Sequence, residues 1–164
     1  MAKDTKAETE VYNEMKMLAE GFHEEPKLES VLRNPLLKME EKATLLTTAA
    51  GGSVSELFAR FIRLVLQKGR ESMLPLMARI YIRMYREDKK ITRVLFETPA
   101  PISEATEEHL KKRLKEETGN TIEFSGATKP ELIGGFVLRI GGYRLDASYA
   151  GKLREIRNQL IEKH

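Results

Sequence analysis

The sequence predicts an α+β protein in which an all-α N-terminal helical bundle precedes a small α/β C-terminal domain with the order β-α-β-β-β-α. Apolar residues recur at helical spacing through the first half of the chain, and the period shortens to that of a strand from Ile91 onward. Between the two patterns lies Glu87-Asp-Lys-Lys90, which contains no apolar residue. We therefore expect a helical domain over residues 1–88 and an α/β domain over residues 89–164.

The helical domain is expected to contain five helices. The first spans roughly residues 4–23, where apolar residues from Val11 to Phe22 lie on one helical face. A short second helix opens at Pro26 and stops at Asn34-Pro35, because proline disfavours helical backbone in the residue before it. A third helix is expected over roughly 38–49.

A capping box, Ser53-Val-Ser-Glu56, predicts the start of the fourth helix, with Ser53 at the cap and the Glu56 side chain reaching back to it. The helix that follows is apolar over more than half of its circumference, so we expect it to pack on two sides at the centre of the domain. Its apolar residues are Leu57, Phe58, Phe61, Ile62, Leu64, Val65 and Leu66.

The fifth helix is expected over roughly residues 72–87. Met73, Met77, Ile80 and Met84 share one face of it at the spacing of core residues. On this pattern we interpret the methionines of the chain as mainly packing residues. The other face carries Arg79, Arg83 and Arg86.

The C-terminal domain begins with a strand from Ile91 to Phe96. A helix follows, capped by Ser103 and ended near residue 118 by Gly119. A second strand runs from Thr121 to Ala127, and a terminal helix capped by Ser148 is expected over roughly 149–163.

Two further strands, from Phe136 to Ile140 and from Tyr143 to Ala147, predict a β-hairpin. The Gly141-Gly142 pair between them supplies the positive φ angles that a two-residue turn requires. One face of the hairpin is expected to be apolar and to hold Phe136, Leu138, Ile140, Tyr143, Leu145 and Ala147. The other face carries Arg139 opposite Arg144, a pair of like charges that is unfavourable unless Asp146 lies diagonally between them.

Composition limits the classes of function. The 164 residues include no cysteine, which excludes disulfides and thiolate metal sites and suits a reducing compartment. No apolar run has the length of a membrane span, and no phosphate-binding loop or metal-binding histidine motif occurs. His23, His109 and His164 lie in or near different helices without a neighbouring nucleophile. We therefore expect no catalytic residue, no metal and no cofactor, and a hydrolase is the least favoured function.

Charge is unevenly distributed along the chain. Residues 60–93 carry 10 basic and 3 acidic side chains, a net charge of +7, whereas the whole chain carries +3. This block suits phosphates or an acidic protein partner, and equally a set of solvated helix faces. An RNA-binding module using residues 60–93 is the main alternative function. Gly135-Phe136-Val137 partly matches a strand of RNA-recognition motifs, although Phe136 is expected to be buried rather than free to stack on a base.

The stretch Leu132-Ile-Gly-Gly-Phe-Val137 is followed by Arg139-Ile-Gly141 and then by Asp146, Ser148 and Gly151 before a helix. This pattern closely resembles the C-terminal signature of the delta subunit of the rotary ATP synthase, the bacterial counterpart of the oligomycin-sensitivity-conferring protein. Weaker similarity to the same family extends over nearly the whole chain. It includes Leu32-Arg-Asn-Pro35 and the helix that ends in Gly69-Arg70.

The resemblance implies a non-catalytic stator subunit of a proton-translocating ATP synthase, which couples proton flow to ATP synthesis. It implies that the N-terminal domain binds N-terminal segments of the alpha subunits of the catalytic head. It implies that the C-terminal domain binds the b subunits of the peripheral stalk. The expected location is the cytoplasmic face of the bacterial membrane, with attachment only through the complex and without nucleic acid.

The Arg-Tyr-Ala-x-Ala-Leu motif of the family's first helix has no match in this sequence. We therefore expect the chain to lack that helix, through truncation, a misassigned start or a native difference. Family alpha segments dock against helices one and five, and helix five corresponds to about residues 54–68. Without helix one we expect some of the apolar side chains of this helix to be left exposed. The chain should then self-associate through that face, or fray at residues 1–20, and bind the alpha segment poorly. The expected partner-binding residues are Phe58, Phe61, Ile62, Val65, Arg139 and Arg144.

Overall fold

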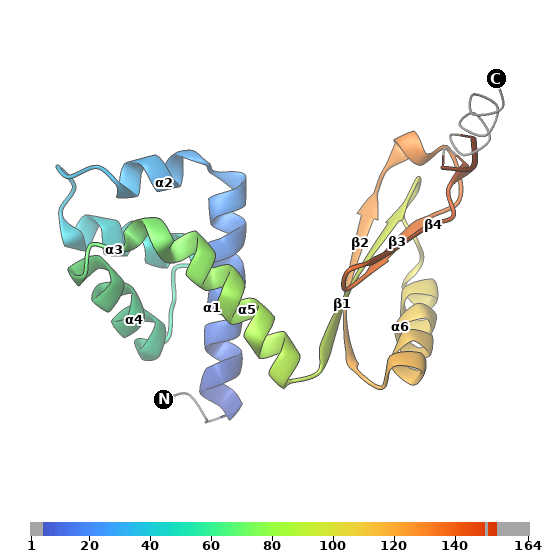
Figure 1. Ribbon diagram of the computed structural model, residues 1–164, viewed down its shortest axis with the longest axis horizontal. Helices are drawn as coiled ribbons and strands as arrows, with labels where there is room; N and C mark the ends of the chain where they lie inside the picture. The colour runs from blue at the N-terminus through green and yellow to red at the C-terminus, as the bar shows by residue number, and fades with distance from the viewer. Residues whose placement is uncertain (1–4, 150, 154–164) are drawn as a thin grey trace, which may run out of the picture. The chain divides into compact units, whose positions relative to one another are not determined.

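The computed structural model describes residues 5–149 and 151–153, and the chain divides into two compact units, residues 1–85 and residues 86–164. The first unit is helical, and the second is built on a four-stranded sheet, which confirms the predicted fold class (Figure 1). Independent folding of the two units remains a prediction.

The first unit contains the five predicted helices in the predicted order. The last of these helices ends at Asp88, and its final residues, from Arg86 onward, belong to the second unit. A 3-10 turn, Glu71–Met73, precedes that helix. The helices are α1 (Thr5–Glu24), α2 (Lys27–Leu32), α3 (Met39–Ala49), α4 (Glu56–Gln67) and α5 (Leu74–Asp88).

The core of the first unit lies among α1, α3, α4 and α5. Leu18, Leu46, Phe58, Ile62 and Leu74 are all fully buried in it. These five side chains come from four helices, so each helix contributes its apolar face to one common core.

Two tyrosine rings join α1 to α5 at the edge of this core. The rings of Tyr12 and Tyr85 are stacked with their centroids 4.2 Å apart. The Tyr85 hydroxyl also lies 2.9 Å from the hydroxyl of Thr9. Stacking adds to the apolar area that the two helices bury and fixes their facing residues.

The sequence-based prediction for α5 is wrong about its buried face. Leu74, Ala78 and Ile82 are buried. On the predicted face Met73, Ile80 and Met84 are 48%, 39% and 60% exposed, and Met77 is partly buried against the core. Both faces carry apolar residues at helical spacing, so the period alone does not distinguish them. The interpretation of the methionines as mainly packing residues is also wrong, because Met17 and Met39 are exposed as well.

The predicted capping box of α4 is wrong too, since Ser55 rather than Ser53 caps the helix. The Ser55 hydroxyl accepts a hydrogen bond from the Phe58 N–H at 3.3 Å. The carboxylate of Glu14, on α1, accepts from both the N–H and the hydroxyl of Ser55. Ser53 and Ser55 are locally similar candidates for the cap, and this tertiary contact favours Ser55.

The second unit is a mixed sheet with the strand order β2-β1-β3-β4. Strands β1 (Ile91–Thr98) and β2 (Thr121–Thr128) are parallel and are connected by α6 (Glu104–Thr118). Strands β3 (Val137–Ile140) and β4 (Tyr143–Asp146) form the predicted hairpin. Residues 149 and 151–153 are helical, and the rest of the predicted terminal helix lies outside the described residues.

The hairpin register is as predicted, with Ile140 opposite Tyr143 and Leu138 opposite Leu145. Burial of the apolar face is only partly as expected. Helix α6 packs on the sheet over β2 (Figure 1). Val94 and Phe96 of β1 are buried on that face of the sheet, but Tyr143 and Leu145 on the edge strand are 86% and 56% exposed.

Candidate partner-binding surfaces

The predicted partner-binding residues of α4 are mostly inside the protein. Phe58 and Ile62 are fully buried, Val65 is 5% exposed, and Phe61 is partly buried. The expectation that the four would be left exposed is therefore wrong for three of them, because the chain's own helices cover them. The structure thus removes the reason given for self-association through this face, and Phe61 remains as a surface candidate.

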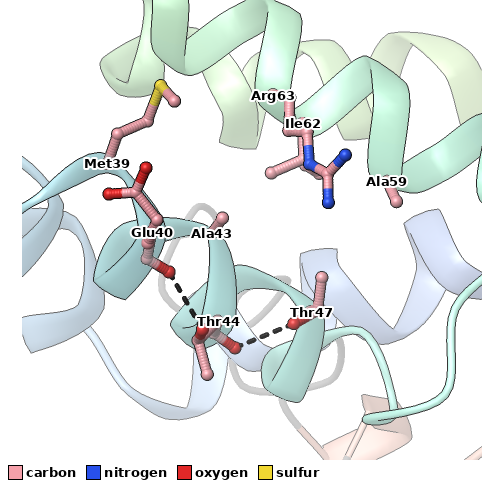
Figure 2. A pocket seen from close by; sticks show the side chains of 8 residues that line it. All are labelled: Met39, Glu40, Ala43, Thr44, Thr47, Ala59, Ile62 and Arg63. Carbon is pink, nitrogen blue, oxygen red and sulfur yellow. Dashed lines mark hydrogen bonds between the residues drawn. The ribbon is translucent and has the colours of Figure 1, made fainter.

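A groove lies between α3 and α4, on the outer side of Ile62 (Figure 2). Its volume is about 360 Å³, which is in the range of sites that accept small ligands or protruding side chains. The lining residues are Met39, Glu40, Ala43, Thr44 and Thr47 of α3, and Ala59, Ile62 and Arg63 of α4.

The threonine hydroxyls of this groove are already occupied. The Thr44 hydroxyl donates to the Glu40 carbonyl and the Thr47 hydroxyl donates to the Thr44 carbonyl, each at 2.9 Å. The groove therefore offers mainly methyl and methylene groups, with charged Glu40 and Arg63 among its lining side chains. Such a surface suits an apolar side chain of a partner helix rather than a polar substrate.

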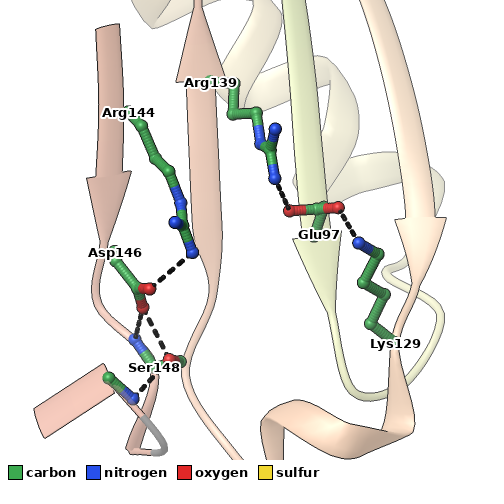
Figure 3. A network of polar contacts seen from close by, with 7 residues as sticks. Glu97, Lys129, Arg139, Arg144, Asp146 and Ser148 are labelled. Atoms are coloured by element: carbon green, nitrogen blue, oxygen red, sulfur yellow. Dashed lines mark hydrogen bonds and ion pairs between the residues drawn. The ribbon is translucent and has the colours of Figure 1, made fainter. Parts of the chain in front are cut away.

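A chain of ionic contacts crosses the sheet of the second unit (Figure 3). Glu97, on β1, is only 4% exposed, and its carboxylate contacts Lys129 Nζ at 2.5 Å and Arg139 Nη2 at 3.5 Å. The hydrogen bond from Lys129 holds the pKa of the Glu97 carboxyl below its usual value, against the opposing effect of burial.

The two arginines of the hairpin lie directly opposite each other, as predicted. Arg139 is compensated by Glu97 on the neighbouring strand, and Arg144 is compensated by Asp146 at 2.8 Å. Both arginine side chains are about half exposed, at 47% and 51%. They therefore have accessible surface for a partner.

The glycines of the signature stretch allow two segments to lie in contact. Gly135 has a φ of +75°, and a Cβ there would lie 2.2 Å from the carbonyl oxygen of Ala147. A Cβ on Gly134 would lie 2.5 Å from the ring of Tyr149. The Tyr149 N–H donates to the Gly134 carbonyl at 3.1 Å, so the hairpin entrance and the chain after β4 are locked together.

Asp146 and Ser148 form the turn that starts the helix after β4. Asp146 Oδ1 accepts from the Ser148 N–H at 3.1 Å and from its hydroxyl at 2.6 Å. Ser148 Oγ in turn accepts from the Gly151 N–H at 3.0 Å, which confirms Ser148 as the predicted cap. A Cβ on Gly151 would lie 2.7 Å from Asp146 Oδ1. The signature residues thus have a structural role in fixing this junction.

The described part of the chain contains no group of three or more histidine, aspartate or glutamate side chains able to hold a metal ion. His23 and His109 are exposed on helices, and His164 lies outside the described residues. None of the helices described is both long enough and apolar enough to span a membrane.

Comparison with known proteins gives a family match. The family model described as "ATP synthase delta (OSCP) subunit" matches residues 1–160. ATP synthase subunit delta of Parabacteroides distasonis is 55% identical over 162 residues, which cover 99% of this chain and 90% of the relative. The subunit of the same name from Phocaeicola vulgatus is 39% identical over 164 residues, covering 99% of this chain and 89% of the relative.

A solved structure has the same fold. A chain in the cryo-EM structure of the Toxoplasma gondii mitochondrial ATP synthase hexamer superimposes with a TM-score of 0.66. The match covers 93% of this chain and 87% of that one at 16% sequence identity.

Proposed function

Because this chain belongs to the ATP synthase delta (OSCP) subunit family, we propose that it joins the alpha subunits of the catalytic head to the b subunits of the peripheral stalk. Family membership over 99% of the chain is the observation that carries this proposal. The chain acts as a stator subunit associated with other ATP synthase subunits, and its role is mechanical. We expect no turnover by the isolated chain and a peripheral position at the cytoplasmic face of the membrane.

The first unit is proposed to bind an alpha-subunit segment along α4. The groove between α3 and α4 and the half-buried Phe61 provide apolar surface there. A helix that places apolar side chains in this groove would bury them against Ala43 and Ala59, whose small side chains permit close approach.

The second unit is proposed to bind the b subunits at the β3–β4 hairpin. Tyr143 and Leu145 are exposed on one face of the hairpin, and Arg139 and Arg144 are half exposed on its other face. An exposed tyrosine and an arginine pair are residue types that often dominate the energetics of protein interfaces.

The RNA-binding alternative is not favoured by the structure. Stacking on bases requires exposed aromatic side chains. Phe136, the aromatic residue in the matching stretch, instead packs against Phe96 with the ring centroids 5.2 Å apart.

A pull-down with the tagged chain from membrane extracts tests the proposal. We expect alpha and b subunits to co-elute with it. Replacing both hairpin arginines, Arg139→Ala with Arg144→Ala, should lower recovery of b without affecting recovery of alpha. Arg113→Ala is a matched control, because Arg113 is 71% exposed on α6 and pairs with Glu117 one helical turn away. Failure of the unaltered chain to retain either subunit would contradict the proposed function.

A further inference from the structure

Ile133, in the turn before β3, combines an exposed apolar side chain with a backbone conformation that isoleucine rarely adopts. It is 74% exposed. Its φ is +63° and its ψ is −37°, and a β-branched residue at positive φ is a conformational outlier. Among the described residues, the positive φ angles belong to six glycines, Lys90 and Ile133. Glycine would fit this position without strain, so the backbone gives no reason for an isoleucine here.

Ile133 is the central residue of a tight turn. The Gly134 N–H donates a hydrogen bond to the Leu132 carbonyl at 2.6 Å, which closes a three-residue γ-turn. A positive φ with a negative ψ at the centre is the rare and strained form of this turn. Strained residues persist only where the surrounding structure over-determines the backbone, and they cluster at functional sites.

Contacts on both sides hold this turn in place. Before it, the Lys129 N–H donates to the Thr98 carbonyl at 2.7 Å, and Lys129 Nζ contacts the buried carboxylate of Glu97. After it, the Tyr149 N–H donates to the Gly134 carbonyl at 3.1 Å. The turn is therefore fixed by β1 on one side and by the chain after β4 on the other. A side chain presented on a fixed backbone binds a partner with a smaller loss of conformational entropy.

The neighbours of Ile133 have structural roles, whereas most of the isoleucine side chain is uncovered. Leu132 is 8% exposed and anchors the turn in the second unit. A Cβ at Gly134 would lie 2.5 Å from the ring of Tyr149, so glycine is needed at that position. Replacing Ile133 by glycine would remove little buried apolar area and would relieve the strain of the turn.

Ile133 lies next to the surface proposed for the b subunits. It precedes the start of β3 by four residues, and the bond between Gly134 and Tyr149 brings it to the point where β4 has ended. Tyr149 is itself 59% exposed. Two side chains expose far less than the area of about 800 Å² per partner that a stable interface buries. They therefore extend the hairpin surface rather than support a dimer of this chain on their own.

We propose that Ile133 is a specificity-determining residue of the second unit, whose side chain inserts into an apolar pocket of the b subunits. The strained turn holds this branched side chain outside the unit, where a partner reaches it. The inference rests on the proposed binding of b at the hairpin and adds the residue by which that partner is recognised.

Two measurements on the full chain separate binding from stability. Fluorescence anisotropy gives the affinity for a labelled soluble fragment of the b subunits, and circular dichroism gives the thermal midpoint. Ile133→Gly should weaken binding of the b fragment roughly tenfold. The same substitution should raise the thermal midpoint by about 4 °C, because strain is relieved and little apolar contact is lost. A residue with only a structural role would not change the two quantities in this way.

Three further variants separate the side chain from the backbone. Ile133→Ala should weaken binding to the same extent and leave the thermal midpoint nearly unchanged, because alanine keeps a Cβ at positive φ. Ile133→Leu should retain binding, because it keeps the apolar volume. Arg113→Ala, at an exposed position on α6, should change neither quantity.

Four results would contradict the inference. Equal binding of the b fragment by the unaltered chain, Ile133→Gly and Ile133→Ala would overturn it and leave the proposed function standing. A lower thermal midpoint in both variants would show that the chain itself covers this side chain. A concentration-dependent dimer that Ile133→Gly dissolves would assign the side chain to a second copy. Absence of binding by the unaltered chain would contradict the proposed function, and this inference with it.

Discussion

The Glu14 carboxylate on α1 accepts two hydrogen bonds from Ser55, one from the backbone N–H and one, at 2.8 Å, from the hydroxyl. Glu14 is 7% exposed, although it is a charged residue. One side chain thus attaches α1 to the N-terminus of α4, the helix beside the proposed alpha-binding groove. A carboxylate near a helix N-terminus is also favoured by the helix dipole.

Replacing Glu14 should therefore destabilise the first unit. We expect Glu14→Ala to lower the free energy of unfolding by about 2–3 kcal/mol, because hydrogen bonds to a charged group are lost and Ser55 is left with an unsatisfied N–H. Urea denaturation followed by circular dichroism measures the change. Glu20→Ala is the matched control, since Glu20 is exposed on the same helix and should change stability by less than about 0.5 kcal/mol. Equal effects of the two substitutions would exclude the proposed role of Glu14.

Gly135 is predicted to be irreplaceable at the junction between the hairpin and the chain after β4. Its φ is +75°, and a Cβ would approach the Ala147 carbonyl oxygen to 2.2 Å. Gly135→Ala should cost about 2–4 kcal/mol, the sum of backbone strain and overpacking.

Gly142→Ala provides the control for the junction. A Cβ at Gly142 would meet no atom within 4 Å, and we expect little change in the thermal midpoint. A Gly135→Ala variant as stable as Gly142→Ala would show that the close contact between the two segments does not exist in solution.

The ion pairs of Glu97 predict a pH dependence of stability. Lys129 lowers the pKa of Glu97 in the folded chain below its value in the unfolded chain. The stabilisation is therefore present above the unfolded pKa and is lost as the pH falls through the folded pKa. Glu97→Gln should be less stable than the unaltered chain by about 1–3 kcal/mol at pH 7, and the difference should shrink toward pH 3. A difference that is constant from pH 7 to pH 3 would argue against an ionised Glu97.

The two units are predicted to fold independently. Lys89-Lys90 lies between the end of α5 and the start of β1, so brief trypsin treatment should cut there first and leave a stable C-terminal fragment. Mass spectrometry identifies the fragment, and circular dichroism tests its cooperative unfolding. Cleavage spread evenly through both units, with no stable fragment, would indicate a single cooperative domain.

Local signals in the sequence were sufficient for most element boundaries. Ser103 caps α6 by accepting from the Thr106 N–H, and Gly119 ends it with a φ of +68°, as predicted. The Gly141-Gly142 turn determines the hairpin register, because a two-residue loop leaves one pairing for the strands.

The features that could not be predicted depend on contacts between residues far apart in the chain. Ser53 and Ser55 are both acceptable caps, and Glu14 on another helix decides between them. Whether Phe58 is covered depends on the packing of the whole bundle. Buried Glu97 gives no periodic signal of its own, and its partner Lys129 comes from beyond the next strand.

The central claim is that this chain bridges the catalytic head and the peripheral stalk, and mass photometry of a reconstituted mixture tests it most directly. The mixture contains the head lacking its delta subunit and a soluble fragment of the b subunits, with or without the chain. The account predicts a particle containing head and b fragment only when the chain is present, and loss of the b fragment alone with the Arg139→Ala, Arg144→Ala variant. Assembly of head with b fragment to the same extent in the absence of the chain would contradict it.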